Sequence, residues 1–181
     1  STQAKTLFPY TTLFRSGISK IMKELVLILD NIRSVHNVGS IFRTAETAGV
    51  NKIYCLGTTP IPVDRFGNKR SDFAKVALGA EDLVSWEYSE DAKTLITKLK
   101  KDGFTIIALE QDKNSVIYNK IPKQQKVALI VGNEVGGVDK SILKKANYIA
   151  EIPMKGQKES LNVSVATGIM LYEFSRGDMV K

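Results

Sequence analysis

The feature that most constrains the fold is a series of short, nearly uninterrupted apolar runs separated by segments of helical periodicity. Four runs have the length and composition of strands buried on both faces of a sheet: Glu24–Leu29, Lys52–Leu56, Thr105–Leu109 and Lys126–Val131. Two weaker runs, Val84–Tyr88 and Tyr148–Ile152, are also expected to be strands. Because strands alternating with helices are typical of α/β domains, we predict a single α/β domain with a mostly parallel sheet flanked by helices.

Four helices are expected between these strands, where apolar residues recur three or four positions apart. They are Val38–Ala48 before Gly49, a helix capped by Ser89 and ended by Gly103, a helix from its N-cap Asp139 through Ala146, and Leu161–Arg176 before Gly177. The segment Gly57–Lys75, which contains two prolines, is expected to be irregular.

The segment Ser1–Ile21 is expected to stand outside the domain, which would then span residues 22–181. Within it, the string TLFPYTTLFRS has no period that continues into the following residues. It resembles the translation of a sequencing-adapter oligonucleotide, and it lacks the layout of a secretory signal. The alternative is a native, disordered arm that touches RNA.

Composition sets mild limits on function. None of the apolar runs approaches the ~20 residues that a membrane-spanning helix needs, so no membrane partner is expected. The single cysteine, Cys55, lies in an apolar run and is expected to be a buried thiol in a reducing, cytoplasmic compartment. No Cys/His cluster has metal-ligand spacing, so no metal site is expected. The net charge is +7, but without Ser1–Ile21 the 23 basic minus 19 acidic residues leave +4, which favours nucleic acid only weakly.

Three clusters of polar residues and glycines follow predicted strands: NIRSVHNVGSIFR from Asn31, GNEVGG from Gly132, and IPMKGQKESLNVSV from Ile152. Because ligands bind open α/β sheets at the carboxyl ends of the strands, these clusters are candidate binding loops. Each also has a purely structural interpretation. The first contains a helix cap and a snorkelling arginine, the second is a tight glycine turn, and the third is a helix capped by Ser160.

Individual residues in these clusters suggest chemistry beyond folding. Asn37, at the expected helix entrance, is suited to cap the helix or bind a phosphate. Glu134, beside a buried strand end, needs a polar partner, and Asn162 needs one too if it is buried. His36 is a conceivable general base, but a single histidine in a polar turn is more often an exposed neighbour of a cap.

Taken together, the strings NVGSIFRTAETAGV, IVGNEVGGV and IPMKGQKESLNVSVATGIMLYE resemble the three motifs of the SpoU/TrmH branch of knotted RNA methyltransferases. The resemblance extends from Glu24 to Arg176. It implies a C-terminal deep trefoil knot, S-adenosyl-L-methionine as cofactor, transfer of its methyl group to a ribose 2′-hydroxyl of tRNA or rRNA, and a homodimer with the active site at the subunit interface.

The resemblance also assigns roles. It places the family's catalytic positions at Asn37, Arg43, Glu134 and Asn162. It places the cofactor against a second set, largely through backbone groups: Leu109, Gly132, Ile152, Ser160 and Leu161. In this interpretation Arg43 holds the ribose hydroxyl and a neighbouring phosphate, Glu134 and Asn162 hold Arg43, and Asn37 anchors the RNA backbone. A guanidinium stays protonated at neutral pH and is a poor base, so Arg43 is expected to position its ligand.

RNA is expected to contact a basic loop that contains Arg65, Lys69 and Arg70, and lysines 140, 144 and 145. The helix dipole alone also selects Lys144 and Lys145 near a helix end. Two alternatives stay open: a catalytically silent RNA-binding module with the same fold, and a knotted enzyme that methylates a base nitrogen. The pairing of Asn37 with Arg43 favours ribose chemistry.

Overall fold

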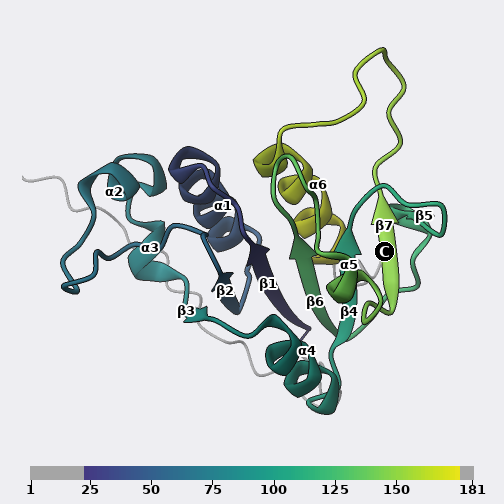
Figure 1. The fold of residues 1–181 in the computed structure, drawn as a ribbon, viewed down its shortest axis with the longest axis horizontal. Helices are drawn as coiled ribbons and strands as arrows, with labels where there is room; N and C mark the ends of the chain where they lie inside the picture. The colour runs from purple at the N-terminus through teal and green to yellow at the C-terminus, as the bar shows by residue number, and fades with distance from the viewer. Residues whose placement is uncertain (1–22, 176–181) are drawn as a thin grey trace, which may run out of the picture.

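The computed structural model describes residues 23–175, so the proposed boundary at Ser1–Ile21 lies outside the described residues. Its centre is a parallel sheet of seven strands in the order β3-β2-β1-β6-β4-β7-β5 (Figure 1). The strands are β1 (Glu24–Asp30), β2 (Lys52–Leu56), β3 (Trp86–Ser89), β4 (Thr105–Leu109), β5 (Val116–Ile117), β6 (Lys126–Val131) and β7 (Tyr148–Glu151). The prediction of a flanked, mostly parallel sheet is confirmed.

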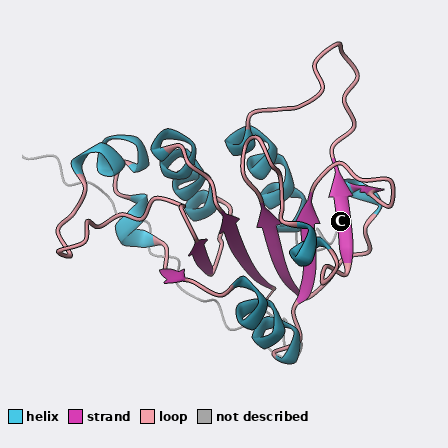
Figure 2. Cartoon of the chain, viewed as in Figure 1, coloured by secondary structure: helices cyan, strands magenta, loops and turns pink. Residues whose placement is uncertain are grey.

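Helices cover both faces of this sheet (Figure 2). They are α1 (Val35–Thr47), α2 (Ser71–Ala77), α3 (Ala80–Leu83), α4 (Ala92–Lys101), α5 (Lys140–Leu143) and α6 (Val163–Ser175), with a 3₁₀ turn η1 at Tyr118–Lys120. The apolar side chains of α1, α2, α3 and α6 pack with one face, and those of α4 and α5 pack with the other.

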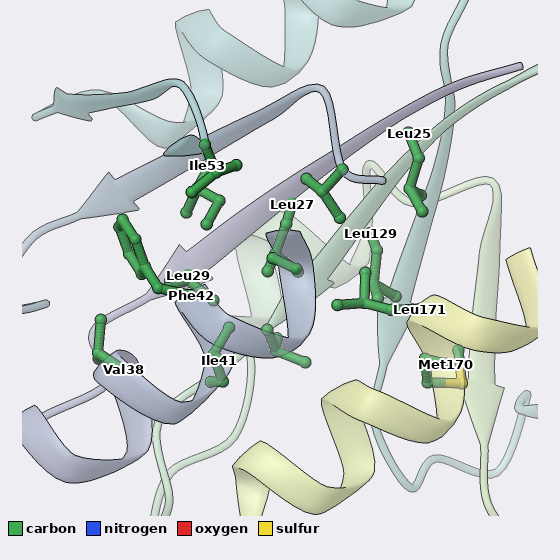
Figure 3. Close-up of a cluster of buried hydrophobic side chains, with 14 of the residues drawn as sticks. Leu25, Leu27, Leu29, Val38, Ile41, Phe42, Ile53, Leu129, Met170 and Leu171 are labelled. Carbon is green, nitrogen blue, oxygen red and sulfur yellow. The ribbon is translucent and has the colours of Figure 1, made fainter. Parts of the chain in front are cut away.

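The larger core lies between the first of these faces and α1 and α6. Leu25, Leu27 and Leu29 alternate along β1 toward the two helices, where Phe42 and Leu171 meet them (Figure 3). All five side chains are buried. The intervening residues of β1 face the second core under α4. A strand buried on both faces is therefore apolar at nearly every position, which is why β1 was predictable from its composition.

The register brings the carboxyl ends of the central strands to one level. Leu29 of β1 is paired with Val131 of β6, and Val131 is paired with Leu109 of β4. Leu109 is in turn paired with Ala150 of β7. The loops that follow these strands therefore leave the sheet at the same edge, as expected for ligand-binding loops of an α/β fold.

Several predicted helix ends are wrong, and at the starts of α1 and α4 a side-chain cap is the reason. The helix α1 starts at Val35, earlier than Val38, because the Ser34 hydroxyl accepts the Asn37 amide proton. Asp91, and not Ser89, caps α4. Asp139 caps α5 as predicted, but α5 ends at Leu143.

The last helix also starts later than predicted. Helix α6 begins at Val163, and the side chain of Asn162 accepts the amide proton of Ser164 at 2.9 Å. Asn162 therefore fulfils the capping role that the structural interpretation gave to Ser160.

Other elements escaped the sequence patterns. Helix α2 begins inside Gly57–Lys75, which was expected to be irregular throughout. The two-residue strand β5 and the turn η1 have no periodicity to detect.

Cys55 is fully buried as expected, and burial raises the pKa of its thiol to about 12. Across residues 23–175, the longest helices fall short of the length and apolarity needed to cross a bilayer.

Candidate functional site

A cavity of about 460 Å³ opens at the carboxyl edge of the sheet, between the loops after β4, β6 and β7 and the start of α6. All five residues expected to bind the cofactor line it: Leu109, Gly132, Ile152, Ser160 and Leu161. Glu134 and Asn162 also belong to the lining. Its volume lies in the range of small-molecule and cofactor pockets, and Leu109, Ile152 and Leu161 give it apolar walls beside polar groups.

The loop between β6 and α5 can form one wall because it contains two sterically required glycines. A Cβ on Gly132 would overlap the backbone of Gly137 and Val138. Gly137 has a φ of +66°, and a Cβ there would overlap the carboxylate of Glu110. Asn133 and Gly137 also form an isolated antiparallel bridge. The GNEVGG string therefore codes for a loop that folds back tightly on itself.

Glu110, the first residue after β4, stabilises the loop between β6 and α5 through hydrogen bonds. Its carboxylate accepts the amide protons of Val138 at 2.9 Å and of its neighbour Gln111 at 2.9 Å. The side chain of Gln111 then donates to the carbonyl oxygen of Glu159 at 2.7 Å. These two residues tie together the three loops that line the cavity.

A row of three polar side chains joins the candidate catalytic residues. Asn162 donates through Nδ2 to Oδ1 of Asn37 at 3.1 Å, and Asn37 donates through Nδ2 to Oε1 of Glu134 at 3.0 Å. Glu134 also accepts the amide protons of Arg33 at 3.3 Å and Ser34 at 3.4 Å. Positions from the first, second and third motifs thus meet in one hydrogen-bonded network.

The charge of Glu134 is set by this network. Partial burial acts to raise the pKa of its carboxyl, but the hydrogen bonds from Asn37 and from the amides of Arg33 and Ser34 outweigh it, so that the pKa lies below its usual value. Glu134 is consequently an anion at neutral pH, and it accepts hydrogen bonds from the loop after β1.

Asn37 occupies a different place from the one expected. It lies in the first turn of α1, inside the helix, while Ser34 is the cap. Its side chain is engaged with Glu134 and Asn162. Within the described residues, its role is to join two loops and not to cap a helix.

The position of Arg43 also differs from the one expected. It is exposed on α1, and its guanidinium makes no hydrogen bond or ion pair with residues 23–175. It is also absent from the described lining of the cavity. Glu134 and Asn162 therefore do not hold Arg43 within one chain. They hold Asn37. His36 is exposed on the same helix and likewise lies outside the lining.

The basic loop also differs from expectation, because two of its three cations are paired with acids. Lys69 forms an ion pair with Asp82 at 2.6 Å, and Arg70 forms one with Asp72 at 2.7 Å. Arg65 instead lies over the ring of Phe66, 4.6 Å from its centroid. Two of the three cations are thus already paired with acids at the surface, and the role of this loop in RNA binding stays a prediction.

Some residues of the site carried no sequence signal. Glu110 follows a strand that reads as plain core, and its contact with Val138 joins residues far apart in the chain. Asn133 donates to the carbonyl oxygen of Asn31 at 2.8 Å, and Asn31 adopts a φ of +57°. The only sequence signal for this contact was an asparagine, Asn133, inside a glycine-rich string.

Among residues 23–175, no group of three or more His, Cys, Asp or Glu is arranged to hold a metal ion.

Comparisons with known proteins agree with this geometry. A profile described as the SpoU rRNA Methylase family matches residues 24–172. The chain is 33% identical over 162 residues to a tRNA (guanosine(18)-2′-O)-methyltransferase of Aquifex aeolicus, which covers 90% of this chain and 74% of that protein. It is 32% identical over 152 residues to a 23S rRNA (guanosine-2′-O-)-methyltransferase of Coxiella burnetii, covering 84% of this chain but 58% of the relative.

A solved structure shows the same fold with the cofactor present. The AdoMet-bound rRNA methyltransferase from Sinorhizobium meliloti superposes with a TM-score of 0.76 at 30% identity, over 87% of this chain and 57% of that one. The chain thus spans somewhat more than half the length of several of the proteins that it matches.

Proposed function

The chain belongs to the SpoU rRNA methylase family, and we propose that it transfers a methyl group from S-adenosyl-L-methionine to a ribose 2′-hydroxyl of tRNA or rRNA. The single observation that carries this proposal is the convergence of three separate loops on one cavity, with the Glu134–Asn37–Asn162 network at its edge. The cofactor supplies an electrophilic methyl group, and the chain's own residues supply the geometry.

The residues of the cavity fit an adenosine-containing cofactor. Gly132 is buried and has no side chain, so its backbone borders the cavity directly. The apolar side chains of Leu109, Ile152 and Leu161 suit an aromatic base and a methionine chain. Ser160, exposed at the end of the third loop, adds a hydroxyl. Orientation is the larger part of catalysis here, because well-oriented groups gain about 7–11 kcal/mol over free encounter.

Arg43 positions the ribose and its neighbouring phosphate. Its planar guanidinium can donate to both at once, and its lack of an acidic partner within the described residues leaves those donors available. Glu134 and Asn162 keep Asn37 and the loops in place, and Asn37 lies where the RNA backbone approaches. The 2′-hydroxyl proton passes to the phosphate or to solvent, because a guanidinium is a poor base at neutral pH.

The active site is shared by two copies of the chain. Two large apolar side chains on α6, seven residues apart, are exposed, Val165 at 52% and Tyr172 at 49%, and Leu161, at 40%, lies just before the helix. An apolar stripe of this kind is typical of a helix packed against a partner. A homodimer through the α1–α6 face would bring Arg43 of one copy to the cavity of the other, which explains why Arg43 lies outside its own cavity.

Isothermal titration with S-adenosyl-L-methionine separates this enzyme from a silent RNA-binding module. We expect binding with a dissociation constant in the micromolar range, and a silent module would show none. Mapping of ribose methylation in host RNA with and without the protein then identifies the substrate. An unchanged map, or a lost methyl group on a base, would exclude ribose methylation as the activity.

A further inference from the structure

A second hollow, of about 760 Å³, lies beside the cofactor cavity at the same edge of the sheet. The two share a wall made of the loop after β4 and the GNEVGG loop, with Glu110, Gln111, Val135 and Gly137 lining both. Val135 lies on this wall and is 92% exposed. The two hollows are therefore direct neighbours, separated by a wall that both loops form.

The cations of this hollow are available. Lys113, Lys140 and Lys144 line it, and none of them forms an ion pair or hydrogen bond through its ammonium group with residues 23–175. This distinguishes them from Lys69 and Arg70, whose charges are matched by Asp82 and Asp72. Unpaired lysines are the kind that exchange counterions for phosphates.

The acids of the hollow are already engaged with the protein. The Glu110 carboxylate accepts the amide protons of Val138 and Gln111, and the Asp112 carboxylate accepts that of Asn114 at 2.8 Å. The three lysines of the lining outnumber its two carboxylates, Glu110 and Asp112, so the hollow has a net charge of +1. The remaining lining includes the apolar side chains of Val138, Leu143 and Ile149. Phosphate-binding cations above apolar surface match the chemistry of a nucleotide, with its charged backbone and flat base.

We propose that this hollow binds a single-stranded RNA segment adjacent to the methylated nucleotide, with its phosphates on Lys113, Lys140 and Lys144. This inference rests on the proposed function, because it needs RNA to enter the neighbouring cavity. Lys140 and Lys144 were expected from the sequence to contact RNA. The proposal adds Lys113 and assigns all three lysines to one surface, which is separate from the basic loop around Lys69.

The test compares two triple variants of the full chain that lose the same charge. One carries Lys113→Gln, Lys140→Gln and Lys144→Gln. The control carries Lys98→Gln, Lys100→Gln and Lys101→Gln in the last turn of α4, at the opposite edge of the sheet. Fluorescence anisotropy with a labelled single-stranded oligoribonucleotide, over a series of salt concentrations, measures RNA affinity. Calorimetry with S-adenosyl-L-methionine measures the cofactor site separately.

We expect the hollow variant to lose at least tenfold in RNA affinity at low salt. Each phosphate contact with single-stranded RNA contributes about −0.7 to the slope of log K against log salt, so three lost contacts flatten the slope by about 2. The control should keep its slope, a Lys→Arg triple in the hollow should keep the affinity, and all variants should bind the cofactor equally.

Equal losses in both Gln triples, or an unchanged slope in the hollow variant, would overturn the proposal even in an active methyltransferase. Conversely, selective loss of RNA binding in a chain that never binds S-adenosyl-L-methionine would support the hollow while refuting the proposed function. The two failures are therefore distinguishable.

Discussion

Glu134 is the residue on which the polar part of the site depends, since Asn37 and two backbone amides donate to it. Because these hydrogen bonds outweigh partial burial, the pKa of Glu134 lies below its ordinary 4.5. A carboxyl with a lowered pKa stabilises the folded arrangement above its unfolded pKa, and that contribution is lost as the pH falls through the lowered value. The network should thus be intact at neutral pH and open in acid.

Arg43 provides the sharpest test of a residue role. We expect Arg43→Ala to lower kcat by about 10³-fold or more, as removal of a group that acts only in the transition state does. The affinity for S-adenosyl-L-methionine should stay within a few-fold, because Arg43 does not line the cavity of its own chain and in our proposal contacts the ribose and phosphate of the RNA. Steady-state kinetics and calorimetry measure the two quantities. An equal fall in cofactor affinity would show that Arg43 is structural.

Glu110 should matter for the cofactor even though the sequence did not single it out. Glu110→Ala leaves the Val138 and Gln111 amides without their acceptor, a loss of about 1–3 kcal/mol that loosens the shared wall. We expect cofactor affinity to fall about tenfold or more, with partial recovery in Glu110→Gln. Glu159→Ala is the control, because Glu159 is an exposed acid that lines the same cavity. Its carboxylate accepts no hydrogen bond from residues 23–175, since Gln111 donates to its backbone carbonyl oxygen. Similar affinities in Glu110→Ala and Glu159→Ala would refute the bracing role.

At this scale the sequence located polar residues better than it located their partners. Glu134 and Asn162 were singled out because buried polar side chains need hydrogen bonds, and Asn37 because it lay at a helix entrance. The three form one network. Which residue binds which depends on contacts about a hundred residues apart along the chain, and these follow from strand order and not from local pattern. The expected contacts of Arg43 with Glu134 and Asn162 are absent within one chain, over residues 23–175, and between two copies they stay a prediction.

Among the elements, the contact between α1 and α2 depends on a glycine inside a helix. A Cβ on Gly39 would lie 2.8 Å from Cβ of Val76. Gly39→Ala should therefore lower the free energy of unfolding by about 1–3 kcal/mol through overpacking, although alanine is the better helix former. Gly168→Ala in α6 is the matched control, because the nearest atom to its Cβ is Cγ2 of Thr44 at an ordinary 3.5 Å.

Chemical denaturation of the two glycine variants measures the difference. Gly168→Ala is expected to raise the free energy of unfolding by about 0.5–1 kcal/mol, since helix propensity alone acts there. Stabilisation by Gly39→Ala to the same extent would contradict the close packing of α1 on α2.

An element was predictable when most of its residues followed one pattern of apolar and polar positions. The strands β4 and β6 were predicted to the residue, because a buried parallel strand is apolar throughout. Helix ends depend on single side-chain hydrogen bonds, such as Ser34 with Asn37, and several were misplaced. The short elements β5 and α2 are held by tertiary contacts and left little periodicity to read.

For the whole molecule, the decisive question is whether two copies share each active site. A heterodimer of an Arg43→Ala chain and an Asn162→Ala chain, purified through two different tags, tests this. If Arg43 acts on the partner's cavity, one of the two sites retains both residues, and the heterodimer should show about half the activity of the wild type. Each variant alone should be nearly inactive.

An inactive heterodimer would show that Arg43 acts within its own chain.

The trefoil knot is likewise a property of the whole molecule, and it stays a prediction from the family resemblance. Physical reasoning on the sequence alone could not have supplied it, because knots are nearly absent from proteins.

The most direct test of the whole account follows a labelled methyl group from S-adenosyl-L-methionine into RNA. The purified protein is incubated with total RNA from a host that lacks it, and the RNA is digested to nucleosides and separated. The account predicts label in a 2′-O-methylated nucleoside, with none when Arg43→Ala protein is used. Label in a methylated base, or RNA that accepts no label at all, would contradict it.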